Sequence, residues 1–415
     1  MPGSARAWRK GGARRALEAQ RVTQTIDVPT TVVRDVIEIR RDLHRHPELG
    51  FEEVRTAGIV ADRLKRLGFD VRSKIAQTGV VGILRTGRPG RTVLLRADMD
   101  ALPLEERSGV DYASCIAGKM HACGHDGHVA ILLGAAGMLM ERREQLCGTI
   151  VLCFQPAEEG KGGAKAMIDA GLLDDPHVDR VYGLHLLSQA PCGIVRVRPG
   201  PVMASSDSIE ITIHGRGGHG AAPHETIDPI VTAAHFVTQV QSVVSRAIEP
   251  IEPAVVTIGA ISGGTIHNVI PDDVRMLGTV RAFSSDVRNR MEPRIEAILR
   301  GCCEAHGASY DFSYQRRYPV TSNNPAEAAY VRALAARTLG EERVGEMTPT
   351  MGAEDFSFML ERRPGCFFFL GTRSDERTSA PHHNARFAID EAALETGVRM
   401  MVALAIDAPR QQDPR

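Results

Sequence analysis

The stretch TVLLRADMD, residues 92–100, predicts a short buried strand that ends in two carboxylates. Its first residues are nearly all apolar, as in strands that are covered on both faces of a sheet. The same pattern recurs at 149–154, followed by QPAEE, and at 180–184, followed by His185. Open α/β sheets place ligand sites beyond the carboxyl ends of their strands. The sequence therefore predicts an α/β fold with a mostly parallel sheet flanked by helices, and a site at one edge of that sheet.

Helical patterns surround these strands. Apolar residues recur at helical spacing from Thr31 until Pro47, where proline forbids continuation of the helix. A second apolar stripe runs from Ala57 to Leu67 and ends at Gly68, a residue suited to the C-terminal cap of a helix. Further elements are expected as strands at 79–85 and 366–370 and as helices at 129–140, from 325 to 339 and from 390 onward.

The region after Gly200 has a different pattern, in which apolar and polar residues alternate. The expected elements are a strand at 208–214, a helix at 229–245, strands at 255–259 and 274–283, a helix at 286–302 and a strand at 309–316. This β-α-β-β-α-β order is typical of a ferredoxin-like α+β domain. We therefore predict a first domain made of residues 31–200 and 320–415, an inserted domain at 201–319 and a flexible tail at 1–30.

Composition excludes several classes of partner. Among 415 residues, 50 Lys and Arg balance 51 Asp and Glu, so no basic field indicates nucleic acid or an anionic membrane surface. Aromatic residues make up 5% of the chain, which is too few for stacking on single-stranded nucleic acid. The apolar run at 129–140 is well short of the ~20 residues that cross a bilayer. We expect neither nucleic acid nor a membrane as a partner.

The cysteines and the N-terminal segment indicate a compartment. The chain has 8 cysteines, two of them adjacent at Cys302 and Cys303, which does not resemble a disulfide framework and fits a reducing cytoplasm. Residues 1–21 are rich in arginine but lack the apolar segment of a secretory signal. We therefore predict a cytoplasmic protein.

The densest group of reactive side chains is HACGHDGH, residues 121–128. Thiolate and imidazole are ligands for zinc and neighbouring transition ions, and one intervening glycine lets Cys123 and His125 converge on one region. The alternative is a hydrogen-bonded pair of structural histidines. Further donors follow the strands or lie near the C-terminus, namely Glu158, Glu159, His185, His382 and His383. These separated donors exceed what a closed structural zinc site requires, so we expect an open, reactive metal site.

Glu158 and Glu159 are neighbours and must point in different directions at a strand end. One carboxylate can then bind metal while the other faces the attacking water. A carboxylate beside a metal-activated water can take its proton and pass it to a leaving nitrogen. The alternative is a pair of surface glutamates in salt bridges.

Five motifs in one order resemble a known family. They are RDLHRHPELG at 41–50, RADMDALP at 96–103, MHACGHDGH at 120–128, QPAEEG at 155–160 and MGAEDF at 351–356. Together they resemble the M20 metallopeptidase family, and specifically its amidohydrolase branch of hippurate hydrolases, N-acyl-amino-acid amidohydrolases and plant auxin-conjugate hydrolases. The match spans residues 33 to 405. It implies a di-metal catalytic domain with an inserted lid domain that often mediates dimers, and hence a homo-oligomer through residues 201–319.

The resemblance also implies roles for individual residues. It assigns two divalent ions, Mn or Zn, to Cys123, His125, Glu159, His185 and His383. Glu158 is implied as the general base and Asp100 as the residue that orients a ligand imidazole. A thiolate at Cys123 can bridge two ions and hold them ~3.5 to 4 Å apart.

The inserted segment carries further residues of the resemblance. The stretches at 217–219 and 223–224 imply that His219 stabilises the tetrahedral oxyanion, often across a dimer, with His224 at the substrate. The stretches at 264–271 and 278–281 imply that Asn268 and Arg281 bind the carboxylate of a small-molecule substrate. Arginine suits that task because its donors pair bidentately with a planar carboxylate.

Two departures from the family pattern affect the interpretation. His382 stands where the family usually has leucine, so His382 and His383 compete for the last ligand position, and His185 is followed by LLSQ where many relatives carry Asn and Trp. We predict hydrolysis of the C–N bond of an N-acyl amino acid such as an aroyl-glycine. Two alternatives stay open: hydrolytic removal of an amino group from an activated aromatic amine, and a non-catalytic metal- or partner-binding protein.

Overall fold

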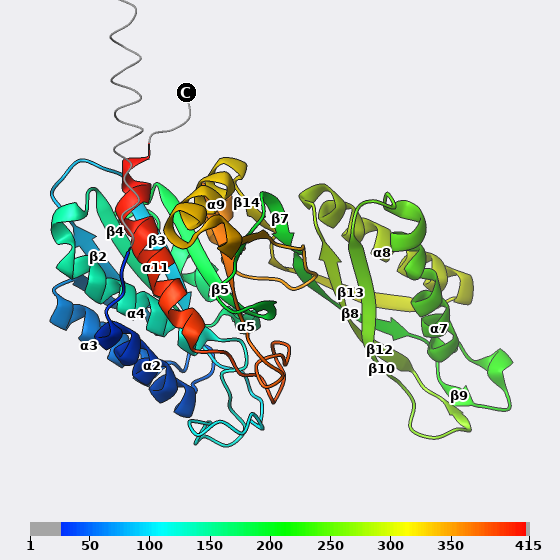
Figure 1. The fold of residues 1–415 in the computed structure, drawn as a ribbon. Helices are drawn as coiled ribbons and strands as arrows, with labels where there is room; N and C mark the ends of the chain where they lie inside the picture. Colours follow the sequence, from blue (N-terminus) through cyan, green and yellow to red (C-terminus); the bar gives the residue numbers. More distant parts are fainter. Residues whose placement is uncertain (1–25, 412–415) are drawn as a thin grey trace, which may run out of the picture.

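Residues 92–98 form strand β3 at the centre of a large sheet (Figure 1). The structure is a computed structural model and describes residues 26–411. The sheet has eight strands in the order β1-β2-β4-β3-β5-β16-β6-β15. Their bounds are β1 Asp70–Ile75, β2 Gly79–Arg85, β3 Thr92–Asp98, β4 Thr149–Gln155, β5 Arg180–Pro191, β6 Val195–Val197, β15 Val344–Glu346 and β16 Gly365–Arg373.

Parallel pairing is concentrated in the middle of this sheet. Strands β4, β3, β5 and β16 run parallel to one another. The pairs β1–β2, β2–β4 and β16–β6 are antiparallel, and the outer pair β6–β15 is parallel. The α/β class expected from the sequence is confirmed, and the sheet is mixed with a parallel centre.

Successive strand residues enter two apolar cores on opposite faces of the sheet. Val93 and Leu95 pack into one core, whereas Leu94 packs into the other. The first core lies under α2 Thr30–Arg45, α3 Val54–Leu67, α4 His125–Glu141, α9 Pro325–Leu339 and α11 Ala392–Asp407. The second lies under the shorter helices α6 Gly163–Asp169 and α10 Ser357–Arg362. Helix α3 ends at Gly68, whose φ of 88° is the left-handed cap that the sequence predicted.

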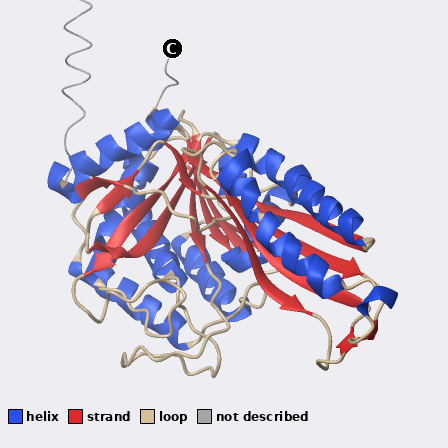
Figure 2. Ribbon diagram, turned by 90° about the vertical axis from the view of Figure 1, so that its right-hand side faces the viewer, coloured by secondary structure: helices blue, strands red, loops and turns tan. Residues whose placement is uncertain are grey.

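Residues 206–318 form a separate small body with its own apolar core (Figure 1). Its sheet is antiparallel in the order β10-β12-β8-β13, and helices α7 and α8 pack on the face that Figure 2 turns toward the viewer. Its elements are β8 Ser206–His214, β9 Gly218–His219, α7 Pro229–Gln239, β10 Ala254–Ser262, β11 Val269–Ile270, β12 Asp273–Ala282, α8 Ser285–His306 and β13 Ser309–Tyr318. The helix expected to run to Ser245 is wrong in its last part, because α7 ends at Gln239 and a π-helical turn follows at Val243–Ala247.

Two adjacent strands connect the small body to the rest of the chain, here called the large body. The chain leaves along β7 Gly200–Met203 and returns along β14 Thr321–Asn323, and these two strands pair antiparallel (Figure 1).

At the N-terminal end of the described chain, Ile26 and Val28 are buried in the first core of the large body. Residues 1–25 of the expected tail lie outside the described residues. Within 26–411, no helix is long and apolar enough to traverse a bilayer.

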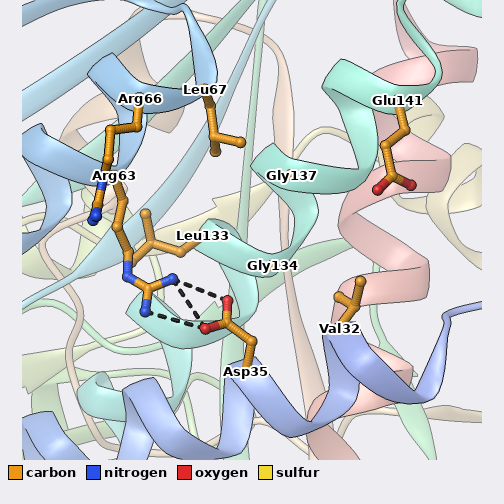
Figure 3. A pocket seen from close by; sticks show the side chains of 9 residues that line it. All are labelled: Val32, Asp35, Arg63, Arg66, Leu67, Leu133, Gly134, Gly137 and Glu141. Atoms are coloured by element: carbon orange, nitrogen blue, oxygen red, sulfur yellow. Dashed lines mark hydrogen bonds and ion pairs between the residues drawn. The ribbon is translucent and has the colours of Figure 1, made fainter.

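Two glycines of helix α4, Gly134 and Gly137, differ in how closely the neighbouring helices approach them. A methyl group added at Gly134 would lie 2.4 Å from Val36 Cγ2 and 3.1 Å from Val398 Cγ2, whereas one at Gly137 would meet open space. Both glycines line an open hollow of about 260 Å³ between α2, α3 and α4. Figure 3 shows the residues that line it. An ion pair between Asp35 and Arg63 spans this hollow. Gly134 is therefore required by packing, and Gly137 is not.

We expect opposite effects from alanine at these two glycines. Gly134→Ala forces α2 and α11 away from α4 and should lower the free energy of unfolding by about 1 to 3 kcal/mol. Gly137→Ala fills open space and should raise it by about 0.5 to 1 kcal/mol, because alanine loses less backbone entropy in a helix. Urea unfolding of both variants measures the difference. Equal stabilisation by the two substitutions would contradict the close packing at Gly134.

Candidate metal centre

Three neighbouring parallel strands end at the same edge of the large sheet. Strand β3 lies between β4 and β5, and the backbone of Asp98 pairs with that of Gln155. Asp100 follows β3 and Glu158 follows β4, while His185 lies within β5. The polar residues that the sequence placed after three strands are thus brought to one region, as expected for ligand sites of α/β sheets.

The five expected metal ligands come together around Cys123. The donor atoms of Cys123, His125 and His185 all lie within 4.8 Å of one another. A second triad with the same property consists of Cys123, Glu159 and His383. The Cys123 sulfur belongs to both triads and lies 3.5 Å from His185 Nε2. The two triads are therefore overlapping clusters of donor atoms that meet at the Cys123 sulfur, and each could hold a cation.

Local backbone geometry makes the convergence on Cys123 possible. Gly124 has a φ of 91° and directly precedes α4, so the chain reverses between Cys123 and the first helical residue, His125. On the other side, His383 has a φ of 62° and its Nε2 lies 3.1 Å from Glu159 Oε1. The Cys123 thiol and the Glu159 carboxylate raise the pKa of His383 to about 10.

His382 and His383 have different environments. His382 Nε2 accepts a hydrogen bond of 3.3 Å from the Ser188 backbone N–H, and the ring packs against His185 and Phe387. Burial lowers the pKa of His382 to about 3, so this imidazole is neutral. Its Nδ1 lies 3.6 Å from the Cys123 sulfur. Of the two histidines, only His383 forms an ion pair with Glu159 among the described residues. This contact favours His383 as the metal ligand and His382 as a neighbour that packs beside it.

Asp100 contacts two of the candidate ligands. Its Oδ2 accepts a 2.9 Å hydrogen bond from the Glu159 backbone N–H. His125 Nδ1 lies 2.8 Å from the Asp100 carbonyl oxygen and 3.3 Å from Oδ1. His125 Nδ1 is thus directed at Asp100, and Nε2 is the nitrogen left to bind a cation. That Nε2 atom is buried and has no hydrogen-bond partner within residues 26–411.

Glu158 lies between the candidate ligands and a second group of carboxylates. Its carboxyl shares one cluster with His125 and Glu159 and another with Glu354 and Asp355. Burial, followed by the charges of Glu354 and Glu159, raises the pKa of Glu158 well above its usual range. A carboxyl in such surroundings binds a proton readily and can also release it, which suits a general acid and base.

A fully buried arginine holds the second carboxylate group. Arg96 on β3 donates to Asp98 Oδ2 at 2.7 Å, Glu354 Oε1 at 2.7 Å and Asp355 Oδ1 at 3.0 Å. It also donates to Gln155 Oε1 at 2.8 Å. The motifs at 96–103 and 351–356 thus form one network, although their pattern alone indicated no role for Arg96, Glu354 or Asp355.

His128 is a further residue whose role sequence reasoning missed. Its Nδ1 donates to Asp98 Oδ1 at 2.5 Å, and its Nε2 accepts from the Leu186 backbone N–H at 2.9 Å. Its ring lies 4.7 Å from that of His185, centroid to centroid. Since Leu186 follows His185 directly, His128 fixes the backbone that carries this ligand. In the sequence, only the position of His128 within the motif at 120–128 indicated that it belongs to the site.

The structure does not bring the expected residues of the small body to this cluster. His219, on β9, and Asn268, beside β11, are exposed at the end of the small body that lies away from the large sheet (Figure 1). His224 is also exposed, with 77% of its side chain accessible. Arg281, on β12, is partly buried and hydrogen-bonds Thr279 and the Val280 carbonyl, with no carboxylate partner among the described residues. None of these four contacts Cys123 or Glu158 within residues 26–411.

Comparisons with known proteins extend the resemblance over most of the chain. Residues 94–407 match the profile of the peptidase family M20/M25/M40. Thermostable carboxypeptidase 2 of Saccharolobus solfataricus is 43% identical over 376 residues, which cover 89% of this chain and 94% of that protein. The IAA-amino acid hydrolase ILR1-like 4 of Arabidopsis thaliana is 41% identical over 375 residues, with 89% and 84% covered. The structure of the Bacillus subtilis YXEP protein, described as a dinuclear metal-binding peptidase from the M20 family, superposes with a TM-score of 0.81 at 33% identity and covers 92% of this chain and 99% of that chain.

Proposed function

The chain belongs to the peptidase family M20/M25/M40, and we propose that within this family it is an amidohydrolase that cleaves the C–N bond of an N-acyl amino acid, aroyl amino acids included. Membership makes it a metal-dependent hydrolase that acts on C–N bonds. The observation that carries the proposal is the buried Glu158 carboxyl beside the two ligand triads. The plant relative, an IAA-amino acid hydrolase, supports an acyl-amino-acid substrate.

Two divalent ions fit the residues around Cys123. The proposed ligands are Cys123, His125, Glu159, His185 and His383. The buried Nε2 of His125 supports the fit, because it makes no hydrogen bond within residues 26–411, although Asp98 Oδ2 lies 3.4 Å away, and such an atom normally has a hydrogen-bond partner. Thiolate, imidazole and carboxylate together suit Zn or Mn. When bound, a pair of such ions lowers the pKa of a water molecule and polarises a carbonyl oxygen.

The side chains of this protein supply the proton transfers. Glu158 takes a proton from the attacking water and then delivers it to the leaving nitrogen. Its raised pKa favours the second step, because a carboxyl that binds its proton firmly can carry it until the C–N bond breaks. Asp100 holds the His125 imidazole in one tautomer and also fixes the Glu159 backbone. Glu158 thus transfers the proton, while Asp100 keeps two of the proposed metal ligands in position.

We propose that the small body acts as a lid and carries the residues that bind the substrate. Arg281 would bind the substrate carboxylate with Asn268 and His224, and His219 would stabilise the oxyanion. These residues are remote from Cys123 in this chain, so a movement of the lid or a second copy of the chain must bring them in. Exposed apolar side chains on the small body support a homo-oligomer through the lid; they are Ile230, Val231, Ile261, Ile266, Val269 and Leu277.

The cellular location proposed is the cytoplasm. All 8 cysteines are free thiols in the structure, including the adjacent pair Cys302 and Cys303. Free thiols are stable in a reducing compartment, which supports this location.

A substrate panel tests the proposed activity. After loading with Mn or Zn, we expect the protein to hydrolyse N-benzoyl and N-acetyl amino acids and to lose that activity on chelation, because the ions activate the water. Liquid chromatography of the released acid and amino acid measures the reaction. Ammonia released only from aminoarenes would favour the deaminase alternative. No turnover of any substrate by fully loaded protein would favour a non-catalytic role.

Glutamine substitutions separate the two adjacent glutamates. Glu158→Gln should retain both metals and lose ~10²- to 10⁴-fold in kcat, since an amide cannot transfer the proton. Glu159→Gln should instead lose metal, because the amide is a weaker ligand than the carboxylate. Elemental analysis and kcat measured on the same preparations decide between the roles. Exchanged phenotypes would reverse the assignment within the pair.

A further inference from the structure

Glu158 and Glu159 lie on a turn whose backbone conformation is unfavourable on its own. Turn α5 (Glu158–Lys161) leaves the helical region at Glu159, with φ −68° and ψ 74°, and at Gly160, with φ 79°. Ala157, just before it, has a φ of 56°, which is rare for a residue with a side chain. Such a backbone persists only where its surroundings determine it.

Side chains from distant parts of the chain hold this turn. Glu53 Oε1 accepts from the Ala157 N–H at 2.8 Å, and Asp355 Oδ2 accepts from the Ala164 N–H at 2.9 Å. Tyr318 makes two bonds: its hydroxyl donates to the Glu158 carbonyl oxygen at 2.6 Å and accepts from the Gly162 N–H at 2.9 Å. One hydroxyl group therefore bridges the first residue of α5 and the residue that follows its end.

Tyr318 belongs to the small body, in contrast to Glu53 and Asp355. It is the last residue of β13, where it pairs with Ser206 of β8, and the chain then enters the connection to β14. The side chain is buried, and its ring packs edge-on against Phe358 at 6.0 Å. Burial raises the pKa of Tyr318, so its hydroxyl keeps the proton that it donates to Glu158.

We propose that Tyr318 is a positioning residue that couples the small body to the turn carrying Glu158, and so sets where the general base lies relative to the metal ligands. Its neighbour Arg317 reinforces the link, because the guanidinium donates to the Gly160 carbonyl oxygen at 3.3 Å. A displacement of β13 relative to the large sheet would pull on the carbonyl of Glu158 itself. The consequence for catalysis rests on the proposed function, whereas the consequence for the turn does not.

Two phenylalanine substitutions on the same strand test this coupling. Tyr318→Phe removes only the hydroxyl and keeps the buried ring. Tyr314→Phe is the matched control, because the Tyr314 hydroxyl donates to Asp207 Oδ2 at 2.8 Å inside the small body. Metal content, kcat, KM and amide hydrogen exchange of the peptide 157–164 are measured for both variants and for the unmodified protein.

We expect Tyr318→Phe to lower kcat about tenfold per metal-loaded site with KM within about twofold, because small displacements of a reacting group cost rate steeply. Exchange in 157–164 should accelerate about tenfold or more, since the Gly162 amide loses its acceptor. Tyr314→Phe should leave kcat and this peptide unchanged.

Unchanged exchange in 157–164, an unchanged kcat at full metal occupancy, or equal losses in both variants would overturn the coupling. If the unmodified protein hydrolyses no N-acyl amino acid, the proposed function fails, and the exchange comparison alone decides whether Tyr318 holds the turn.

Discussion

The buried guanidinium of Arg96 is the interaction on which the rest of the site depends. It lies in the central strand and is the cation that faces Asp98, Glu354 and Asp355 at once. Removing one partner from a buried ion pair costs about 3 to 5 kcal/mol, because the other charge stays buried and uncompensated. Through Gln155 and Asp98, Arg96 also contacts the end of β4 and reaches His128, which binds the backbone next to His185. One side chain thus links strands β3, β4 and β5.

This network explains how one site can hold metals and move protons. The ligand triads lie on one side of Glu158 and the carboxylates held by Arg96 on the other. Burial, followed by the charges of Glu354 and Glu159, raises the pKa of Glu158, while Asp100 hydrogen-bonds the proposed ligands His125 and Glu159. The turn that presents Glu158 is held from the large body by Glu53 and from the small body by Tyr318. Both bodies therefore contact the turn that carries Glu158, although all the proposed metal ligands belong to the large body.

The sequence predicted the parts of the structure that local patterns encode. Strands β2, β3 and β4, the cap at Gly68 and the carboxylates after β3 and β4 follow from apolar runs and their ends, whereas β5 continues past the expected end at 184, so that His185 lies within it. The links from Arg96 to Glu354 and from Tyr318 to Glu158 join residues 258 and 160 positions apart, so no local periodicity indicates them. The short strands β6 and β15 were not predicted, because three residues are too few to show a periodic pattern. These strands form because their backbones pair with neighbouring strands. The helix predicted to reach Ser245 failed because its apolar stripe continues through a π-helical turn.

The proposed ligand set requires Cys123 to belong to both metal positions at the carboxyl ends of the central parallel strands. Crystals of the protein loaded with Zn or Mn, measured at the absorption edge of the metal, test it most directly. The account predicts two anomalous peaks, both in bonding contact with the Cys123 sulfur at about 2.3 Å for Zn. One of them should be shared with His125 and His185 and the other with Glu159 and His383. A single peak, or two peaks that do not share Cys123, would contradict the account.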